Sequence, residues 1–386
     1  MFARIIAPAL FLAVLAEPAV AQNATQRSAE HDYTIVTVAT GLENPWSLAV
    51  LPNGDMLVTE RAGRLRILRK GALVPEPVAG VPAVRVGGQG GLLDVVLHPK
   101  FATNRLVYLS YSKPNADGTQ GTTAIVRGRF ENDRLTNMQE VIETKVWSTG
   151  RGHYGSRLAF DSAGYLFITV GDRQSPPSGD LEQHPSQLLT THHGKVLRLY
   201  DDGRVPADNP YVGRTDALPE IWSYGHRNMQ GLTVQPGTNV LFGVEHGPQG
   251  GDELNVIEPA KNYGWPVIGF GVNYGSGTTI HSGTTRADME QPVNVWVPSI
   301  ATSGLLFYTG DKFPGWRGNL FVGGMVGERL ARLTLDGKRV MSQELLAQRI
   351  GRVRDVRQGT DGFIYLVLDN KGEGMRSVVR LEPAKR

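Results

Sequence analysis

The chain contains no cysteine, so disulfide bonds and thiol chemistry are excluded. Beyond the N-terminal segment, no apolar run is long enough to cross a bilayer. The basic residues of segment 64–70 alternate with apolar ones, and the net charge is only +3, so no nucleic-acid surface is implied. Sustained helical periodicity is also missing. These absences leave a globular chain whose hydrophobic core must stabilise the fold by itself.

The N-terminus has the three parts of a secretory signal peptide. Arg4 supplies the positive charge, residues 5–15 form a short apolar core, and Ala19 to Ala21 form a cleavage motif. A membrane anchor is the alternative, but this apolar run is short for a membrane span. We therefore expect a signal peptide at 1–21, a single domain at 22–386, and a periplasmic or secreted protein without stable membrane insertion.

The chain is rich in turn-forming residues, with 47 glycines and 23 prolines, and a hairpin pattern recurs along it. In each copy an apolar alternating run is followed by turn residues and a second apolar run, which predicts a β-hairpin. The copies are residues 46–60, 92–112, 156–172, 231–245, 305–324 and 353–369. Most copies are followed by another strand-like run, as at residues 63–68, 123–130, 194–200, 329–335 and 377–382.

Six similar units along one chain are typical of a radial repeat. If each unit is one four-stranded antiparallel blade, the fold is an all-β, six-bladed β-propeller. The strand-like residues 32–39 would pair with the last blade and close the ring. A two-sheet sandwich array is the alternative, but it does not explain the repeat. We expect the long insertions 173–211 and 262–297 to lie on one face and to build a binding site.

Polar residues recur just before the first strand of several hairpins, where a propeller would direct them toward its central channel. His153 there could act as a general base, because the ordinary pKa of histidine lies near working pH; a structural loop histidine is the alternative. Arginines from different blades indicate a ligand with several carboxylates or phosphates, although each alone could form an ordinary salt bridge. The recurring residues are Gln89, His153, Arg227, Asn228, Arg352 and Arg354.

The segment HGPQGGDELN, residues 246–255, combines several hard oxygen donors. The backbone carbonyls of Gly247 and Pro248 and the carboxylates of Asp252 and Glu253 are the kind of ligand that calcium prefers. Zinc is disfavoured because the histidines show no suitable spacing for a shared metal ion. For the two acidic residues, a turn followed by the start of a strand is the alternative.

The motifs GQGGLLD, GHRNMQGL, HGPQGGDE and RVRDV together carry a family resemblance. With them, essentially the whole mature chain resembles the soluble aldose sugar dehydrogenases that use pyrroloquinoline quinone (PQQ), the quinoprotein glucose/sorbosone dehydrogenase-like proteins. The resemblance implies a six-bladed propeller that uses PQQ and calcium to oxidise aldose sugars at the anomeric carbon to lactones. A separate electron acceptor, such as a cytochrome, a quinone or an artificial dye, would reoxidise the cofactor. A calcium-dependent propeller lactonase and a non-catalytic exported sugar-binding propeller are the alternatives.

The resemblance also implies residue roles. His153 would be the catalytic base, and Arg227 would stabilise charge on the reduced cofactor. Gly247 and Pro248 would hold the calcium of the cofactor through their carbonyls. The cofactor-binding residues would be Gln89, Arg227, Asn228, Tyr274, Arg352 and Arg354.

Glu253 and Tyr263 resemble a second calcium site, which leaves His226 and His246 as framework neighbours. The sequence departs from the family pattern at two places. Met325 and Val326 stand where some members have a lysine, and Gly152 stands where some have an aspartate before the base.

Overall fold

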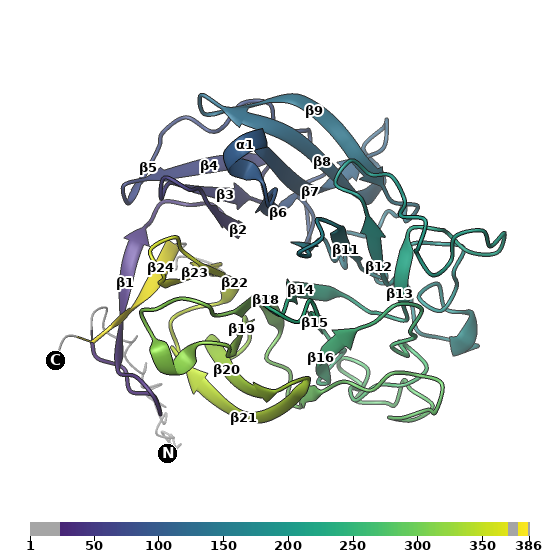
Figure 1. Cartoon of the computed structure of the whole chain (residues 1–386). Helices are drawn as coiled ribbons and strands as arrows, with labels where there is room; N and C mark the ends of the chain where they lie inside the picture. Colours follow the sequence, from purple (N-terminus) through teal and green to yellow (C-terminus); the bar gives the residue numbers. More distant parts are fainter. Residues whose placement is uncertain (1–23, 370–376, 385–386) are drawn as a thin grey trace, which may run out of the picture.

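The structure is a computed structural model that describes residues 24–369 and 377–384. Six four-stranded sheets are arranged around a common axis like the blades of a propeller (Figure 1). This arrangement confirms the predicted all-β, six-bladed propeller of antiparallel blades. The expected signal peptide at 1–21 lies outside the described residues.

Each blade has the same strand order, from an inner strand near the axis to an outer strand at the rim (Figure 1). The inner strands are β2 (Pro45–Val50), β6 (Leu92–Leu97), β10 (Leu158–Phe160), β14 (Met229–Val234), β18 (Thr302–Phe307) and β22 (Val353–Gln358). The second strands are β3 (Met56–Glu60), β7 (Leu106–Pro114), β11 (Leu166–Val170), β15 (Leu241–Glu245), β19 (Leu320–Gly324) and β23 (Ile364–Leu368). The third strands are β4 (Arg64–Arg69), β8 (Gly121–Glu131), β12 (Lys195–Leu199), β16 (Asp252–Ile257), β20 (Arg329–Asp336) and β24 (Ser377–Pro383). The outer strands are β5 (Ala72–Leu73), β9 (Arg134–Glu143), β13 (Ile221–Tyr224), β17 (Asn294–Trp296), β21 (Arg339–Leu346) and β1 (Tyr33–Ala39).

The ring closes by pairing the two ends of the chain. Strand β1 is antiparallel to β24, with Ile35 opposite Leu381. The last blade therefore takes its outer strand from the N-terminal part of the chain and its other three strands from the C-terminal part. This confirms the predicted pairing of residues 32–39 with the last blade.

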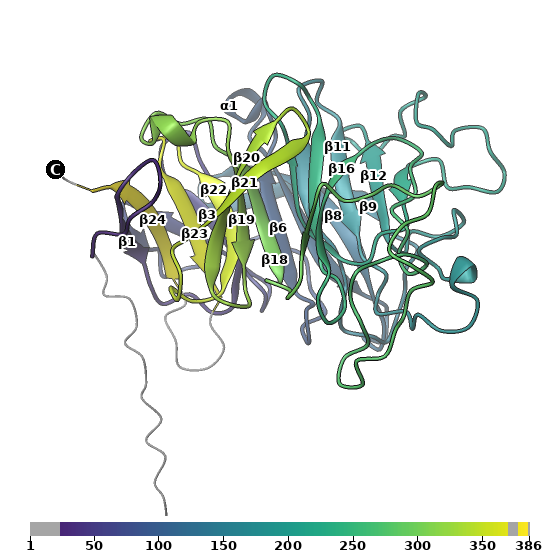
Figure 2. The ribbon, with the colours of Figure 1, turned by 90° about the horizontal axis from the view of Figure 1, so that it is seen from below.

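Helical structure in the described residues is limited to one short helix and two 3-10 turns, namely α1 (Phe101–Asn104), η1 (Leu181–Gln183) and η2 (Pro314–Trp316). Within residues 24–369 and 377–384, no helix is long and apolar enough to cross a membrane. The strands cross the thickness of the ring, and the loops form its two faces (Figure 2).

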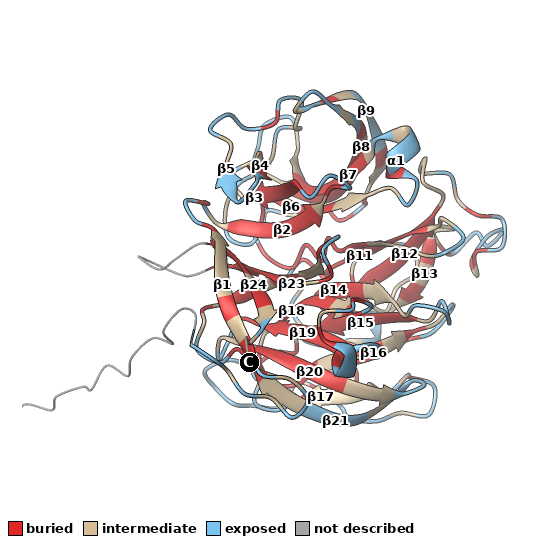
Figure 3. Ribbon diagram, turned by 60° about the vertical axis from the view of Figure 1, so that its left-hand side comes forward, coloured by how far each residue is buried: buried red, intermediate tan, exposed pale blue. Residues whose placement is uncertain are grey.

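The hydrophobic core lies between adjacent blades, because each blade packs its faces against its neighbours. Every residue of β3, β11, β15, β19 and β23 is buried. Figure 3 shows that burial is greatest in the inner parts of the blades and that exposure increases toward the rim. One cluster joins Leu57 and Leu65 of the first blade to Val95 and Leu109 of the second. Strands buried on both faces explain why the second runs of the predicted hairpins are almost continuously apolar.

A buried charge cluster ties the inner strands together. Arg357 donates to Asp94 (Nη2 to Oδ1, 2.7 Å) and to Asp355 (Nε to Oδ2, 2.8 Å). Ser47 donates to Asp94 Oδ1 at 2.6 Å, and Arg157 Nη1 lies 2.9 Å from Asp355 Oδ1. The two carboxylates and two guanidinium groups compensate each other away from water, which a buried charge requires. The cluster links the first, second, third and last blades beneath the loops described next.

Candidate active site

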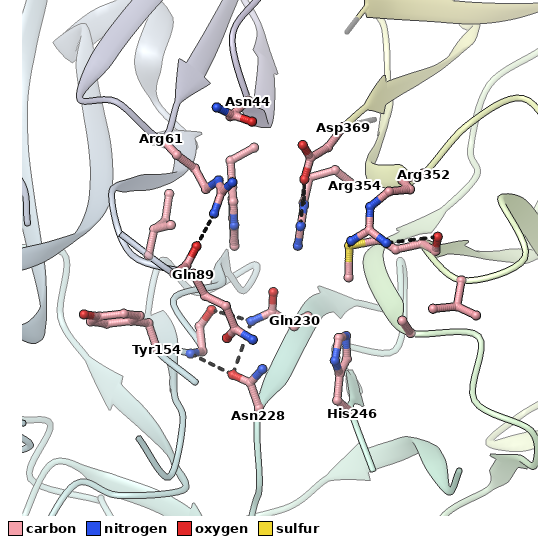
Figure 4. Close-up of a pocket in the computed structure, with 17 residues that line it drawn as sticks. Asn44, Arg61, Gln89, Tyr154, Asn228, Gln230, His246, Arg352, Arg354 and Asp369 are labelled. Atoms are coloured by element: carbon pink, nitrogen blue, oxygen red, sulfur yellow. Dashed lines mark hydrogen bonds and ion pairs between the residues drawn. The ribbon is translucent and has the colours of Figure 1, made fainter. Parts of the chain in front are cut away.

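A cavity of about 600 Å³ lies where the loops of one face meet. The loops that precede the inner strands and those that follow the second strands both reach it (Figure 4). The residues that line it are Asn44, Trp46, Arg61, Gly88, Gln89, Leu93, Tyr154, Gly155, Asn228, Gln230, His246, Ala301, Met325, Val326, Arg352, Arg354 and Asp369.

The charged side chains that line this cavity are three arginines and one carboxylate: Arg61, Arg352, Arg354 and Asp369. Arg354 forms an ion pair with Asp369 (Nη2 to Oδ2, 2.8 Å), and Arg352 donates to the carbonyl of Met325 at 3.4 Å. Figure 4 shows Arg352, Arg354 and Asp369 on one side of the cavity and the amides of Gln89, Asn228 and Gln230 on the other. The lining is therefore net positive, which suits a ligand with several carboxylates.

The amide side of the cavity carries an unsatisfied donor. Asn228 Oδ1 accepts from Gly155 N at 3.1 Å and from Gln230 Nε2 at 3.3 Å. Asn228 Nδ2 is buried and has no hydrogen-bond partner among the described residues. A buried donor without a partner is costly unless a ligand satisfies it. Gln89 lies beside it in Figure 4 and uses Oε1 to accept from the backbone of His153 at 2.7 Å.

His153 forms a buried pair with Asp172. Its Nδ1 lies 2.6 Å from Asp172 Oδ1, and the His153 side chain is 9% exposed. Asp172 follows strand β11, and its backbone N–H donates to the carbonyl of Arg227 at 2.8 Å. The φ angle of His153 is 49°, a left-handed conformation that is unusual for a residue with a side chain. Its backbone N–H donates to Gln89 Oε1 and its carbonyl accepts from the backbone N–H of Arg173, and these two hydrogen bonds hold it in this conformation.

The electrostatics of the pair favour a neutral imidazole beside an ionised carboxylate. Burial lowers the pKa of His153 below its ordinary value; Asp172 opposes this, and Arg227 and Arg173 reinforce it. Burial alone would raise the pKa of Asp172, but His153 and Arg227 hold that pKa below its usual range. A neutral histidine whose Nδ1 proton is held by a carboxylate keeps Nε2 free to accept a proton. In the part of the chain that the structure describes, no hydrogen bond to Nε2 of His153 is made.

Arg227 connects this pair to the predicted metal donors. Its Nη1 donates to the carbonyls of Gly247 (2.7 Å) and His246 (3.1 Å). The Gly247 carbonyl therefore already accepts from a cationic group, so Arg227 occupies an oxygen that a calcium ion would use. Arg227 Nε is buried and has no partner among the described residues.

The four predicted metal-binding residues border one small cavity of about 20 Å³ beside Arg227: Gly247, Pro248, Glu253 and Tyr263. Glu245 borders it too, and it lies opposite Glu253 on the neighbouring strand. Burial and the charge of Glu245 raise the pKa of Glu253 to about 8. Among the described residues, no group of three or more His, Cys, Asp or Glu side chains could hold a metal ion. The hard oxygen donors that calcium prefers are present here, as the backbone carbonyls of Gly247 and Pro248 and the side chains of Glu253 and Tyr263.

The other residues of the HGPQGGDELN segment have structural partners. Asp252 begins β16 and accepts from Gly247 N at 3.1 Å and from Ser299 Oγ at 2.7 Å. It does not border the small cavity, so Asp252 and Glu253 differ although they are adjacent. His246 was expected to be a framework neighbour, but it lines the large cavity and its ring points into it (Figure 4).

Not every predicted residue lines the large cavity. Tyr274 lies in the 272–279 hairpin with 69% of its surface exposed, and it is absent from the cavity lining. None of the described residues of the two long insertions lines this cavity either. The second insertion instead borders the small cavity and reaches Asp172 through Trp265, whose Nε1 donates to Oδ2 at 2.9 Å.

The two departures from the family pattern have local consequences. A Cβ added at Gly152 would lie 2.2 Å from the side-chain oxygen of Gln174, so an aspartate here would require Gln174 to move. Met325 and Val326 both line the large cavity, and Val326 is 54% exposed. The position of the missing lysine therefore presents an apolar wall.

Several lining residues share a simple position that the sequence reasoning did not use. Each directly follows the second strand of its blade: Arg61, His246, Met325 and Asp369. Alignment of the six hairpins by their second strands would have found them, because loops at equivalent positions open on the same face of the ring.

Comparison with known proteins agrees with this geometry. The family model for glucose/sorbosone dehydrogenase matches residues 42–377. The aldose sugar dehydrogenase YliI of Escherichia coli is 43% identical over 334 residues, which cover 85% of this chain and 88% of that protein. The quinoprotein glucose dehydrogenase B of Acinetobacter calcoaceticus is 27% identical over 78% of this chain and 65% of that protein.

Solved structures show the same relationship. The apo-form of the soluble aldose sugar dehydrogenase from E. coli superposes with a TM-score of 0.85 at 40% identity, and covers 91% of this chain and 100% of its own. The PQQ-bound form of an aldose sugar dehydrogenase from Streptomyces coelicolor has a TM-score of 0.73 at 29% identity, over 91% and 98% of the two chains. The chain therefore belongs to the glucose/sorbosone dehydrogenase family of sugar-oxidising β-propellers.

Proposed function

We propose that this protein is a quinoprotein aldose sugar dehydrogenase, which uses PQQ and calcium to oxidise aldose sugars at the anomeric carbon to lactones. The observation that carries the proposal is the buried His153–Asp172 pair next to a cavity lined by three arginines. Several arginines around one ligand suit a tricarboxylate such as PQQ, because each can pair with a carboxylate. A hydrolase or a sugar-binding propeller has no need of them.

The side chains of the large cavity would hold the cofactor. Arg352 and Arg354 would pair with its carboxylates, and the unpaired Nδ2 of Asn228 would donate to it. Gln89 would position it from the same side as Asn228, opposite the two arginines. Gly247 and Pro248 would hold the calcium beside it, and Glu253 and Tyr263 would serve a second calcium. Tyr274 is proposed as a further contact from its exposed hairpin.

The residues of this chain would then prepare the sugar for oxidation. When bound, PQQ supplies a two-electron acceptor for the hydride of the anomeric carbon, and calcium supplies a Lewis acid. His153 would accept the proton of the anomeric hydroxyl on Nε2. Asp172 would fix the tautomer and orientation of the imidazole and stabilise its protonated form. Arg227, beside both, would stabilise negative charge that develops on the reduced ring.

We further propose that residues 22–386 form the single mature domain after removal of residues 1–21, and that it works in the periplasm or outside the cell. Its partners would be aldose sugars and a separate electron acceptor. N-terminal sequencing of the protein recovered from the exported fraction tests this, and a mature N-terminus at Gln22 is the expected result.

Titration of purified apo-protein with PQQ in the presence of calcium tests the function. Quinone absorbance that saturates at one equivalent per chain, together with sugar-dependent dye reduction and lactone formation, is expected. Arg352→Ala should weaken PQQ binding at least tenfold, whereas Arg317→Ala, at an exposed site directly after the 3-10 turn η2, should not. Lactone hydrolysis without PQQ would support the lactonase instead, and sugar binding without turnover would support a non-catalytic propeller.

A further inference from the structure

Trp265 lies in the long insertion between β16 and β17, but its side chain reaches the His153–Asp172 pair. Its indole Nε1 donates to Asp172 Oδ2 at 2.9 Å. The other oxygen, Oδ1, lies 2.6 Å from His153 Nδ1 and accepts from the backbone of Gln174 at 2.8 Å. Trp265 is the only side chain among the described residues that donates to Oδ2. The indole and the imidazole therefore hold opposite oxygens of one buried carboxylate.

The surroundings of Trp265 give it little freedom to move. Its backbone N–H donates to the carbonyl of Gly225 at 2.8 Å, and its carbonyl accepts from Gln187 Nε2 at 2.7 Å. The ring packs edge-on against His184 and His281, with centroids 6.2 Å and 5.5 Å away. Only 7% of the residue is exposed. A side chain fixed in this way can fix the group to which it donates.

The same indole also contacts the arginine beside the base. The guanidinium carbon of Arg227 lies 5.1 Å from the centroid of the Trp265 ring, within the range of a cation–π contact. Trp265 borders the small cavity together with Arg227. One residue from the insertion thus touches both the carboxylate that orients His153 and the cation that faces it.

We propose that Trp265 is a positioning residue for the oxidation: its N–H holds Asp172 with Oδ1 toward His153, and its ring holds Arg227 beside the same pair. This role rests on the proposed function for its kinetic consequence. Its geometric part concerns only residues of this chain and can be measured without cofactor.

The role has a defined effect on proton affinity. The indole N–H withdraws charge from the carboxylate, so its loss leaves Asp172 a stronger partner for a protonated imidazole. The pKa of His153 would then rise, and a larger fraction of the base would be protonated at a given pH below neutrality. The other titratable or charged groups that act on His153 and Asp172 are not themselves substituted in this variant: Arg173, His184, His193, Arg227 and His246.

The test is Trp265→Phe, which keeps an aromatic ring but removes the donor. Loss of a hydrogen bond to a buried charge should reduce kcat/KM roughly tenfold. The acid limb of the kcat/KM profile should move upward by about half a pH unit to one unit. Trp222→Phe is the matched control, because Trp222 Nε1 is buried without a partner among the described residues. That control should keep the wild-type profile.

A second readout uses apo-protein. The imidazole of His153, assigned in NMR spectra with the His153→Gln variant, should titrate at higher pH in Trp265→Phe than in wild type or Trp222→Phe. In an Asp172→Asn background, Trp265→Phe should have no further effect on the kcat/KM profile, since the two residues act together. Equal His153 titration in wild type and Trp265→Phe would overturn the positioning role even if both enzymes oxidise sugar. A wild type that titrates as expected but oxidises no sugar would overturn only the proposed function.

Discussion

Two buried histidine–carboxylate pairs lie in neighbouring blades, and each joins a histidine before the inner strand to a carboxylate near the end of the second strand. His153 pairs with Asp172 at 2.6 Å in the third blade, and His226 pairs with Glu245 at 2.9 Å in the fourth. The second nitrogen of His226 is occupied by Ser223 Oγ at 2.9 Å, and its ring stacks on Tyr263. Nε2 of His153 has no such partner within residues 24–369 and 377–384. The comparison teaches that an open second nitrogen, more than the pair itself, distinguishes a base from a structural histidine.

The largest expected effect on kcat/KM comes from replacement of His153, whose Nε2 is open. His153→Gln should lower kcat/KM by about 10²–10⁴-fold, because a general base contributes on that scale. PQQ binding should persist, since the arginines and amides of the cavity are unchanged. Steady-state dye reduction and a PQQ titration measure the two effects. Near wild-type turnover in this variant would mean that His153 is not the base.

The next largest effect on kcat/KM should come from replacement of Asp172, the partner of His153. Asp172→Asn should lower kcat/KM by roughly 10²-fold, because the imidazole loses its fixed tautomer. The carboxylate raises the pKa of His153, so its removal should move the acid limb of the kcat/KM profile to lower pH. The kcat/KM profile of the variant, recorded alongside wild type, shows both changes. An acid limb that moves upward would contradict the electrostatics described here.

Substitution in the His226–Glu245 pair should reduce stability more than catalysis. His226→Gln removes a partner of buried Glu245, which still accepts from Arg227 N and Asn255 Nδ2. We expect a loss of about 1–3 kcal/mol in the free energy of unfolding, whereas kcat per folded molecule should change only a few-fold. Urea unfolding measures the loss of stability, and active-site titration gives kcat per folded molecule. A large loss of kcat at unchanged stability would place His226 in the chemistry.

The smallest effect concerns a histidine without a carboxylate partner. Burial and the nearby Lys195 lower the pKa of His193 to about 4. The unfolded chain binds this proton near pH 6.5, so the stability from neutral His193 is complete above that pH and is lost as the pH falls toward 4. In His193→Gln the decrease in unfolding free energy between pH 7 and pH 5 should therefore be shallower. Urea unfolding measures this decrease. An equal decrease in wild type and His193→Gln would count against a buried neutral His193.

Much of the fold was predictable, because a propeller repeats one local pattern. The six hairpins and the third strands after most of them appear at the predicted places, and residues 32–39 close the ring. The outer strands were harder to predict. β5 spans only Ala72–Leu73 and β17 only Asn294–Trp296, which is too short for alternation to show.

The candidate site was only partly predictable. Gln89, Asn228, Arg352 and Arg354 line one cavity because they precede or begin inner strands, which their spacing indicated. The spacing before inner strands could not assign Asp172 or Trp265. Asp172 follows a second strand instead of preceding an inner one, and Trp265 reaches it from 93 residues away in sequence. Contacts of this kind depend on how an insertion folds back onto the ring, and no local pattern encodes that.

The closure of the ring by β1 and β24 links ligand binding to mechanical integrity. The seam lies inside the last blade, between β1 and β24. The chain continues from β1 into the first blade, which carries Arg61, whereas Arg352 and Arg354 stand at the inner edge of the last blade on the β24 side. A ligand bound by residues from both sides of the seam would link the N-terminal and C-terminal segments non-covalently. Its binding free energy would add to the work needed to peel β1 away, in proportion to the logarithm of ligand concentration over Kd. The β1–β24 pairing would thus be most stable when a ligand fills the cavity.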